Sequence, residues 1–137
     1  MKTELRFKVR SYECDSYHHV NNAVYLHYLE YARWEFLKDI GFDYNAMIKA
    51  GYAIYISHID LRYKKSAFPD DELLIESKPI KKGAVSGVIE QKISRGNETI
   101  AEAKVSWAFV KANGQPTKIP KEFDLPGLLP EVHEMPS

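Results

Sequence analysis

The chain has 137 residues, which suffice for one domain with a substantial hydrophobic core but not for two. Its 19 basic and 19 acidic residues give a formal net charge of zero, which excludes a strong overall field for nucleic acid or an anionic membrane surface. The sequence has no apolar run of the roughly 18 residues that a membrane span needs, and its charged N-terminal residues are unlike a signal peptide. A single cysteine, Cys14, excludes an intrachain disulfide. We therefore expect a cytoplasmic protein without a nucleic-acid or membrane partner.

The first predicted element is a strand over residues 3–13, because apolar and charged side chains alternate along it. A long helix is predicted over residues 22–40, where apolar residues recur every three or four positions. This apolar stripe consists of Tyr25, Tyr28, Leu29, Ala32, Phe36 and Ile40. Asn21 or Asn22 suits the N-cap of the helix, and Gly41 suits its end.

The remainder of the chain is typical of antiparallel strands. A short helical turn comes first, at residues 44–50. The predicted strands cover residues 52–65, 73–80, 84–95 and 100–110, and the predicted turns lie at residues 69–71, 81–83 and 95–98. Residues 124–137 are predicted as a Pro-rich C-terminal tail that follows a single domain over residues 1–123.

This order of elements predicts an α+β fold, in which a five-stranded antiparallel sheet wraps around one long central helix. A sheet covers only one side of a helix, whereas this helix has apolar residues around much of its circumference. We therefore expect a second copy of the chain to cover part of the rest. The residues concerned are Val24, Leu26, Leu29, Trp34, Phe36 and Leu37.

The residues that could carry chemistry gather just before the long helix. One carboxylate, two imidazoles and two carboxamides lie within residues 15–22. The start of a helix exposes unpaired backbone N–H groups. Asp15 beside such donors would provide a group that attacks or deprotonates, next to groups that hold an oxyanion. The alternative is that Asp15 only stabilises a turn.

Residues 14–33 resemble the signature of hotdog-fold thioesterases, through Cys-Asp-Ser-Tyr-His-His-Val-Asn-Asn-Ala-Val-Tyr-Leu and the later Tyr-Leu-Glu-Tyr-Ala-Arg. They are most similar to the 4-hydroxybenzoyl-CoA thioesterase-like acyl-CoA thioesterases. Weaker similarities at residues 59–74 and 114–120 extend the resemblance over roughly residues 5–123. The resemblance implies a hotdog fold and homodimers or homotetramers with sites at the subunit interface. It also implies hydrolysis of thioesters of coenzyme A or of acyl carrier protein.

The same resemblance assigns residues to the reaction. It implies that Asp15 is the catalytic carboxylate, that His19 is the motif histidine, and that Asn22 lies at the backbone donor of the helix start. Asp15 would act as nucleophile or as general base, and the sequence leaves both open. Tyr17 replaces an asparagine of the plant acyl-carrier-protein branch, and His18 stands where the bacterial branch often has glycine.

Coenzyme A carries phosphates, so we expect local cations to bind it. The predicted substrate-binding residues are Tyr25, Arg62, Lys64, Lys65 and Lys82. We expect no metal, because the histidines and Cys14 lack zinc-site spacing, and no redox cofactor. Three alternatives remain open: an acyl-carrier-protein thioesterase, a hotdog dehydratase, whose His/Asp or His/Glu arrangement is not found, and a non-catalytic acyl-CoA-binding module.

Overall fold

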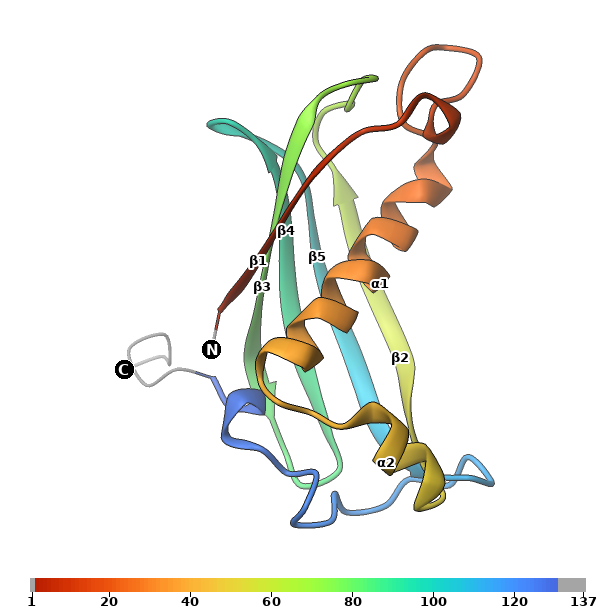
Figure 1. The fold of residues 1–137 in the computed structure, drawn as a ribbon, viewed down its shortest axis with the longest axis vertical. Coiled ribbons are helices and arrows are strands. Elements are labelled where there is room, and N and C mark those ends of the chain that lie inside the picture. The colour runs from red at the N-terminus through yellow and green to blue at the C-terminus, as the bar shows by residue number, and fades with distance from the viewer. Residues whose placement is uncertain (1, 131–137) are drawn as a thin grey trace.

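The computed structural model describes residues 2–130 and confirms the predicted α+β fold (Figure 1). Its five-stranded antiparallel sheet has the order β1-β3-β4-β5-β2. One long helix, α1, lies across one face of this sheet (Figure 1). The elements are β1 (Thr3–Lys8), α1 (Asn22–Asp39), α2 (Tyr44–Lys49), β2 (Tyr52–Tyr63), β3 (Glu72–Lys82), β4 (Ser86–Arg95) and β5 (Glu98–Lys111), with 3₁₀ turns at Ser11–Glu13 and Pro126–Leu128.

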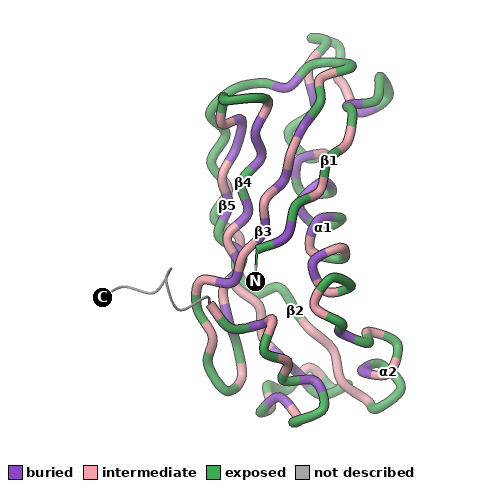
Figure 2. The backbone as a smooth tube through the Cα atoms, turned by 60° about the vertical axis from the view of Figure 1, so that its left-hand side comes forward, coloured by how far each residue is buried: buried purple, intermediate pink, exposed green. Residues whose placement is uncertain are grey.

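Helix α1 forms where the apolar period predicts it. The Asn21 side chain accepts a hydrogen bond from the Ala23 backbone N–H at 2.9 Å, which makes Asn21 the N-cap. Beyond the helix, Gly41 adopts φ +81°, a conformation that glycine tolerates and other residues rarely adopt. Figure 2 shows buried and exposed positions alternating around the helix. The buried side chains are Tyr25, Tyr28, Leu29, Ala32 and Phe36, as the stripe predicts.

Several strand boundaries differ from the prediction: β2 ends at Tyr63 and not at residue 65, β4 begins at Ser86 and not at residue 84, and β5 begins at Glu98 and not at residue 100. The ends of β1 and β3 differ for clear local reasons. Strand β1 ends at Lys8, because residues 11–13 turn away from the sheet in a 3₁₀ turn. The Glu13 carboxylate stabilises this turn by accepting the Arg10 backbone N–H at 2.7 Å. Strand β3 continues through Lys82, since residues 81 and 82 still pair with β4, and the predicted turn shrinks to the residues around Gly83.

The segment after β5 packs against the body of the protein. Its buried side chains are Ile119, Phe123 and Leu128. The Asp124 carboxylate lies 3.0 Å from the Lys82 ammonium, which joins this segment to the β3–β4 hairpin. The predicted tail therefore includes residues that pack on the domain, and its residues 131–137 lie outside the described part of the chain.

Strand β2 is an edge strand, and it pairs with β5 on one side. Within residues 2–130, no strand pairs with its other side. Several large apolar side chains of α1 and β2 are exposed: Leu26, Trp34, Tyr55, Ile56 and Tyr63. None of the helices in the described part combines the length and apolar character that a membrane crossing requires.

Candidate active site

Asp15 lies in a tight hairpin loop that leads directly into α1. Cys14 and Val20 pair as an isolated antiparallel bridge, and the Asp15 N–H donates to the His19 carbonyl at 3.0 Å. The His18 N–H returns to the Asp15 carbonyl at 3.0 Å, with His18 at φ +62°. This pattern is a three-residue loop closed by a left-handed residue. It folds Asp15 back beside the chain that enters the helix.

The two carboxylate oxygens of Asp15 have different surroundings. Oδ1 accepts the Tyr17 backbone N–H at 2.9 Å, as the turn-stabilising alternative predicts. Oδ2 lies 3.7 Å from His19 Nδ1, which is longer than a hydrogen bond. The carboxylate is half-buried, so Oδ2 can still reach a bound molecule. Asp15 thus stabilises its loop with one oxygen and keeps the other available for chemistry.

His19 braces the same loop. Its ring stacks on Tyr17 at 6.0 Å between centroids and 15° between planes, and its Nδ1 lies 3.3 Å from the Val20 carbonyl. Cys14 is a poor competitor for the role of nucleophile. Burial, followed by the negative charges of Glu13 and Asp15, raises the pKa of its thiol, which disfavours the reactive thiolate.

The start of α1 offers one free backbone donor. Asn21 uses its side chain and its carbonyl to accept the N–H groups of Ala23 and Val24, both at 2.9 Å. Within residues 2–130, the Asn22 N–H has no hydrogen-bond partner. The sequence predicts that the unpaired N–H groups at the helix start hold an oxyanion, and among residues 22–24 the structure leaves only the Asn22 N–H without a partner within residues 2–130. The Tyr63 hydroxyl donates to the Asn22 carbonyl at 3.0 Å and fixes this turn.

The buried carboxylate of Glu13, to which the sequence assigns no role, stabilises the segment just before the Asp15 loop. Glu13 accepts the Arg10 side chain at 2.8 Å and the Tyr28 hydroxyl at 3.0 Å, and its carbonyl accepts the Asn21 N–H at 3.0 Å. Burial alone would raise the pKa of the Glu13 carboxyl, but the hydrogen bonds from Arg10 and Tyr28 outweigh it and hold this pKa below its usual value. Burial, and then the bond to Glu13, raises the pKa of Tyr28. The sequence does carry a signal for this role: in the predicted strand, Glu13 falls on the same face as the apolar Leu5, Phe7 and Val9, so an acidic side chain occupies a position that should point inward.

Tyr25 has a packing role, although the sequence predicts substrate contact. Its side chain is 2% exposed, and its hydroxyl accepts the Ala67 N–H at 3.0 Å. The Ala67 carbonyl in turn accepts the Val20 N–H at 2.8 Å. Tyr25 therefore holds the segment after β2 against the loop, and its burial leaves almost no surface for a ligand in the protomer.

The predicted cations do not form one cluster with Asp15. Arg62 and Lys64 point from β2 toward the sheet face opposite α1, in a charged patch with Asp60 and Glu102. Lys65 lies two residues before Ala67, at the same end of the molecule as the Asp15 loop, and its ammonium is 2.7 Å from a Glu98 oxygen.

Lys82 is the last residue of β3, whose first residue, Glu72, pairs with Lys8 next to the segment that leads to Asp15, so Lys82 lies at the other end of the sheet, where Asp124 holds it. Its side chain is 6% exposed, so the structure ties it to the C-terminal segment and away from the Asp15 loop. Across residues 2–130, no three His, Cys, Asp or Glu side chains group as potential metal ligands.

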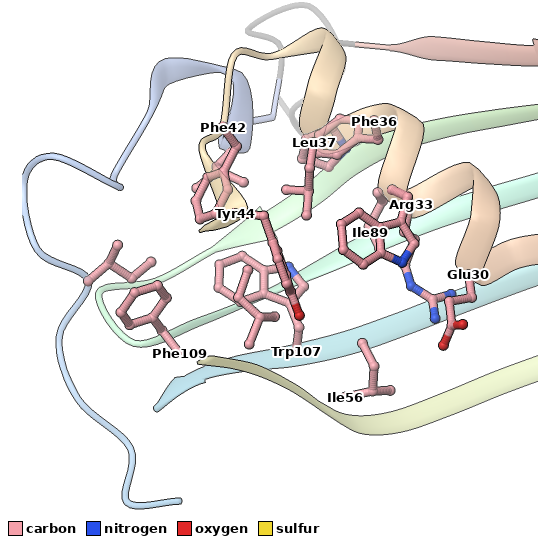
Figure 3. Close-up of a pocket in the computed structure, with 15 residues that line it drawn as sticks. Glu30, Arg33, Phe36, Leu37, Phe42, Tyr44, Ile56, Ile89, Trp107 and Phe109 are labelled. Atoms are coloured by element: carbon pink, nitrogen blue, oxygen red, sulfur yellow. The ribbon is translucent and has the colours of Figure 1, made fainter. Parts of the chain in front are cut away.

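An apolar pocket of about 160 Å³ opens between the second half of α1 and the sheet (Figure 3). Aromatic and aliphatic side chains dominate its wall, with one guanidinium and one carboxylate at its edge. The guanidinium belongs to Arg33 and the carboxylate to Glu30, and the apolar lining residues include Trp34, Leu37, Ile56 and Trp107. The pocket begins two helical turns beyond the free donor of Asn22, so the two features are separate within one protomer.

The fold and this helix start define the class of the protein. Residues 9–126 match the family model of the thioesterase-like superfamily, and the chain belongs to this superfamily, as its motif predicts. It is 32% identical to the long-chain acyl-CoA thioesterase FadM of Escherichia coli over 117 residues, which cover 84% of this chain and 86% of that protein. It is 29% identical to the chloroplastic acyl-acyl carrier protein thioesterase ATL3 of Arabidopsis thaliana over 122 residues, 88% of this chain but 64% of that protein. The crystal structure of a probable thioesterase from Bartonella henselae superimposes with a TM-score of 0.81 at 25% identity, covering 88% of this chain and 100% of that one.

Proposed function

We propose that this protein hydrolyses acyl-CoA thioesters to a free acid and coenzyme A. The observation that supports the proposal is the hairpin loop that holds Asp15 in the segment leading directly into α1, whose first N–H, that of Asn22, has no partner within residues 2–130. Membership of the thioesterase-like superfamily and the similarity to FadM support the same reaction class. The reaction needs no metal or redox cofactor, because a thioester carbonyl is activated and a thiolate leaves readily.

The Asn22 N–H would donate a hydrogen bond to the developing oxyanion of the tetrahedral intermediate. Asp15 can act in two ways. As a nucleophile, its oxygen bonds to the acyl carbon, the carbon–sulfur bond breaks to release the thiolate, and water then opens the mixed anhydride. As a general base, it takes a proton from a water that attacks the same carbon. Single turnover in ¹⁸O-labelled water separates the two, since only the anhydride route can place label in the Asp15 carboxylate.

We further propose a homodimer, or a homotetramer built from such dimers, in which the free edges of two β2 strands lie side by side. Antiparallel pairing would bring the Tyr63 end of one β2, next to Asn22, beside the Ile54 end of its partner, where the pocket lies. The carboxylate of one protomer would then face the acyl pocket of the other. The exposed Trp34 and Ile56 support this arrangement. Light scattering of wild type and Ile56→Lys tests it, with loss of the dimer and of activity expected together.

Lys65 is the cation that we propose for the phosphates of coenzyme A, because it lies at the end of the molecule that carries Asp15, whereas Lys64 points to the opposite face of the sheet. The Lys65→Ala variant should raise KM for acyl-CoA and leave KM for the matching acyl-pantetheine unchanged. Equal effects on both thioesters would argue against phosphate contact. The cytoplasm, which we predict from composition, is where such a substrate occurs.

Acyl carrier protein is the second candidate carrier, and the similarity to ATL3 favours it. The two carriers present the same thioester on the same pantetheine arm and differ in the protein surface. A comparison of kcat/KM for one acyl chain on coenzyme A and on carrier protein decides between them. A higher kcat/KM with the carrier protein would mean that the carrier protein docks on this protein. Similar kcat/KM values for both carriers would mean that only the pantetheine arm is recognised.

A thiol-release assay over a series of acyl-CoA chain lengths, with Asp15→Asn beside wild type, tests the reaction itself. Asparagine keeps the oxygen that accepts the Tyr17 N–H, so the variant should fold normally. We expect kcat to fall by about 10²- to 10⁴-fold. Full activity of Asp15→Asn would overturn the assignment, and binding of acyl-CoA without thiol release by wild type would indicate a non-catalytic module.

A further inference from the structure

Arg33 places a cationic group in the wall of the apolar pocket. It comes from the middle of α1, is half-buried, and lies beside Glu30 at the edge of the pocket (Figure 3). Its Nη1 donates to the Gln91 side-chain oxygen at 3.0 Å. Within residues 2–130 this is the one hydrogen bond of Arg33, and the residue makes no ion pair within 4 Å. A guanidinium has five N–H donors, so most of them remain unused.

The position of the guanidinium is fixed by the core beneath it. Gln91 is 0% exposed, and its amide nitrogen donates to the Leu29 carbonyl and to the Ser77 hydroxyl, both at 3.0 Å. These two bonds orient the Gln91 oxygen toward Arg33. The guanidinium is therefore held in one place, and its remaining donors are not spent on the protein.

The surroundings decide which ligand atom suits Arg33. Trp34, Leu37, Ile56 and Trp107 make this part of the pocket apolar, so an oxygen placed there would form a strong charge-assisted hydrogen bond. A hydrocarbon in the same place would leave the donors desolvated and unpaired. The Glu30 carboxylate already balances part of the positive charge, which favours a neutral acceptor over a second carboxylate.

We propose that Arg33 is a specificity-determining residue that selects acyl groups carrying a neutral oxygen acceptor, a hydroxyl or keto oxygen, over saturated acyl groups of the same length. This inference rests on the proposed function, since it assigns the pocket to the acyl group of the thioester. A site built to donate to a substrate oxygen rejects the analogue that lacks it far more strongly than an apolar pocket does.

The test compares octanoyl-CoA with hydroxyoctanoyl-CoA and oxooctanoyl-CoA isomers that carry the oxygen at different carbons. For wild type, we expect at least one isomer to exceed octanoyl-CoA in kcat/KM by about tenfold or more. Arg33→Met keeps an unbranched apolar side chain without donors. This variant should lose the preference, so that the ratio of kcat/KM for the favoured oxygenated isomer to that for octanoyl-CoA falls to about one.

Ser77→Ala is the matched control, because it removes one partner of Gln91 outside the pocket while the bond to the Leu29 carbonyl still orients the Gln91 side chain. It should lower the thermal unfolding temperature and keep the preference. Dissociation constants of non-hydrolysable thioether analogues, measured by calorimetry on wild type, add a readout that does not need turnover. If Arg33→Met does not fold, this wild-type preference still tests the proposal.

Equal affinity and equal turnover for oxygenated and saturated chains in wild type would overturn the role of Arg33. So would an Arg33→Met protein that keeps the preference. Absence of thiol release from every thioester would contradict the proposed function instead, and the thioether affinities would still report on Arg33.

Discussion

The hydroxyl of Tyr28 in α1 donates to the buried carboxylate of Glu13 at 3.0 Å, and this bond ties the long helix to the segment that leads into Asp15. Glu13 also accepts Arg10 through backbone and side chain. The position of the helix start relative to the Asp15 loop therefore depends on a buried carboxylate whose hydrogen bonds go to Arg10 and Tyr28.

Removal of the Tyr28 hydroxyl should destabilise the protein. Tyr28→Phe keeps the ring that packs 4.6 Å from Phe7 but deprives a buried carboxylate of a donor. We expect the free energy of unfolding to fall by about 1.5–3 kcal/mol in a urea titration. Tyr12→Phe is the control, because the Tyr12 side chain is exposed and its hydroxyl has no hydrogen bond within residues 2–130. A similar loss in both variants would argue against the Glu13 contact.

The free energy of unfolding should decrease at acidic pH because of Glu13. Its pKa in the folded protein lies below the usual value of 4.5, so the folded state binds this proton less readily than the unfolded state. The stabilisation is then complete above about pH 4.5 and is lost as the pH falls through the folded pKa. The difference in unfolding free energy between wild type and Glu13→Gln should be constant at pH 6–8 and shrink below pH 4.5. A difference that grows on acidification would contradict this sign.

The Asn22 N–H can be removed without removing the helix. Asn22 is the first residue of α1, a position that suits proline because no intrahelical bond needs its N–H, and Asn21 before it is already extended at ψ 139°. Asn22→Pro should retain its unfolding temperature and lose about 10²- to 10³-fold in kcat. Asn22→Ala, which keeps the N–H and removes the side chain, should stay active. Loss of activity in Asn22→Ala alone would transfer the role to the carboxamide.

Gly87 in β4 leaves room for the Trp107 ring, which lines the pocket. A Cβ at residue 87 would lie 2.6 Å from the ring and 2.8 Å from the Lys81 carbonyl. Gly87→Ala should therefore displace the ring and lower the free energy of unfolding by about 1–3 kcal/mol. Gly83→Ala in the same hairpin meets nothing closer than 3.6 Å and serves as the control. Equal stability of the two variants, measured by chemical denaturation, would contradict the tight contact.

The fold could be predicted from sequence because its signals are local. The apolar stripe from Tyr25 to Ile40, the cap at Asn21 and the stop at Gly41 each act within a few residues. The candidate site could be found from sequence for the same reason. Asp15 and Asn22 belong to one short segment, and the Cys14–Val20 bridge folds this segment back on itself.

Long-range partners account for what the sequence did not reveal. Lys82 is satisfied by Asp124, and Gln91 orients Arg33 from a strand 58 residues further along the chain. Tyr25, which the sequence predicts to contact substrate, is covered by the segment around Ala67. No periodicity or spacing reports such pairings, because the sheet topology alone decides which strands meet.

The pocket takes part of its lining from the last described stretch of the chain, since Ile119 and Leu128 contribute to its wall. During synthesis these residues emerge from the ribosome after all five strands. A nascent chain can thus assemble its sheet and its central helix while the cavity is still unfinished, and a ligand of the pocket binds the finished cavity only in molecules that have already synthesised residues 119–128.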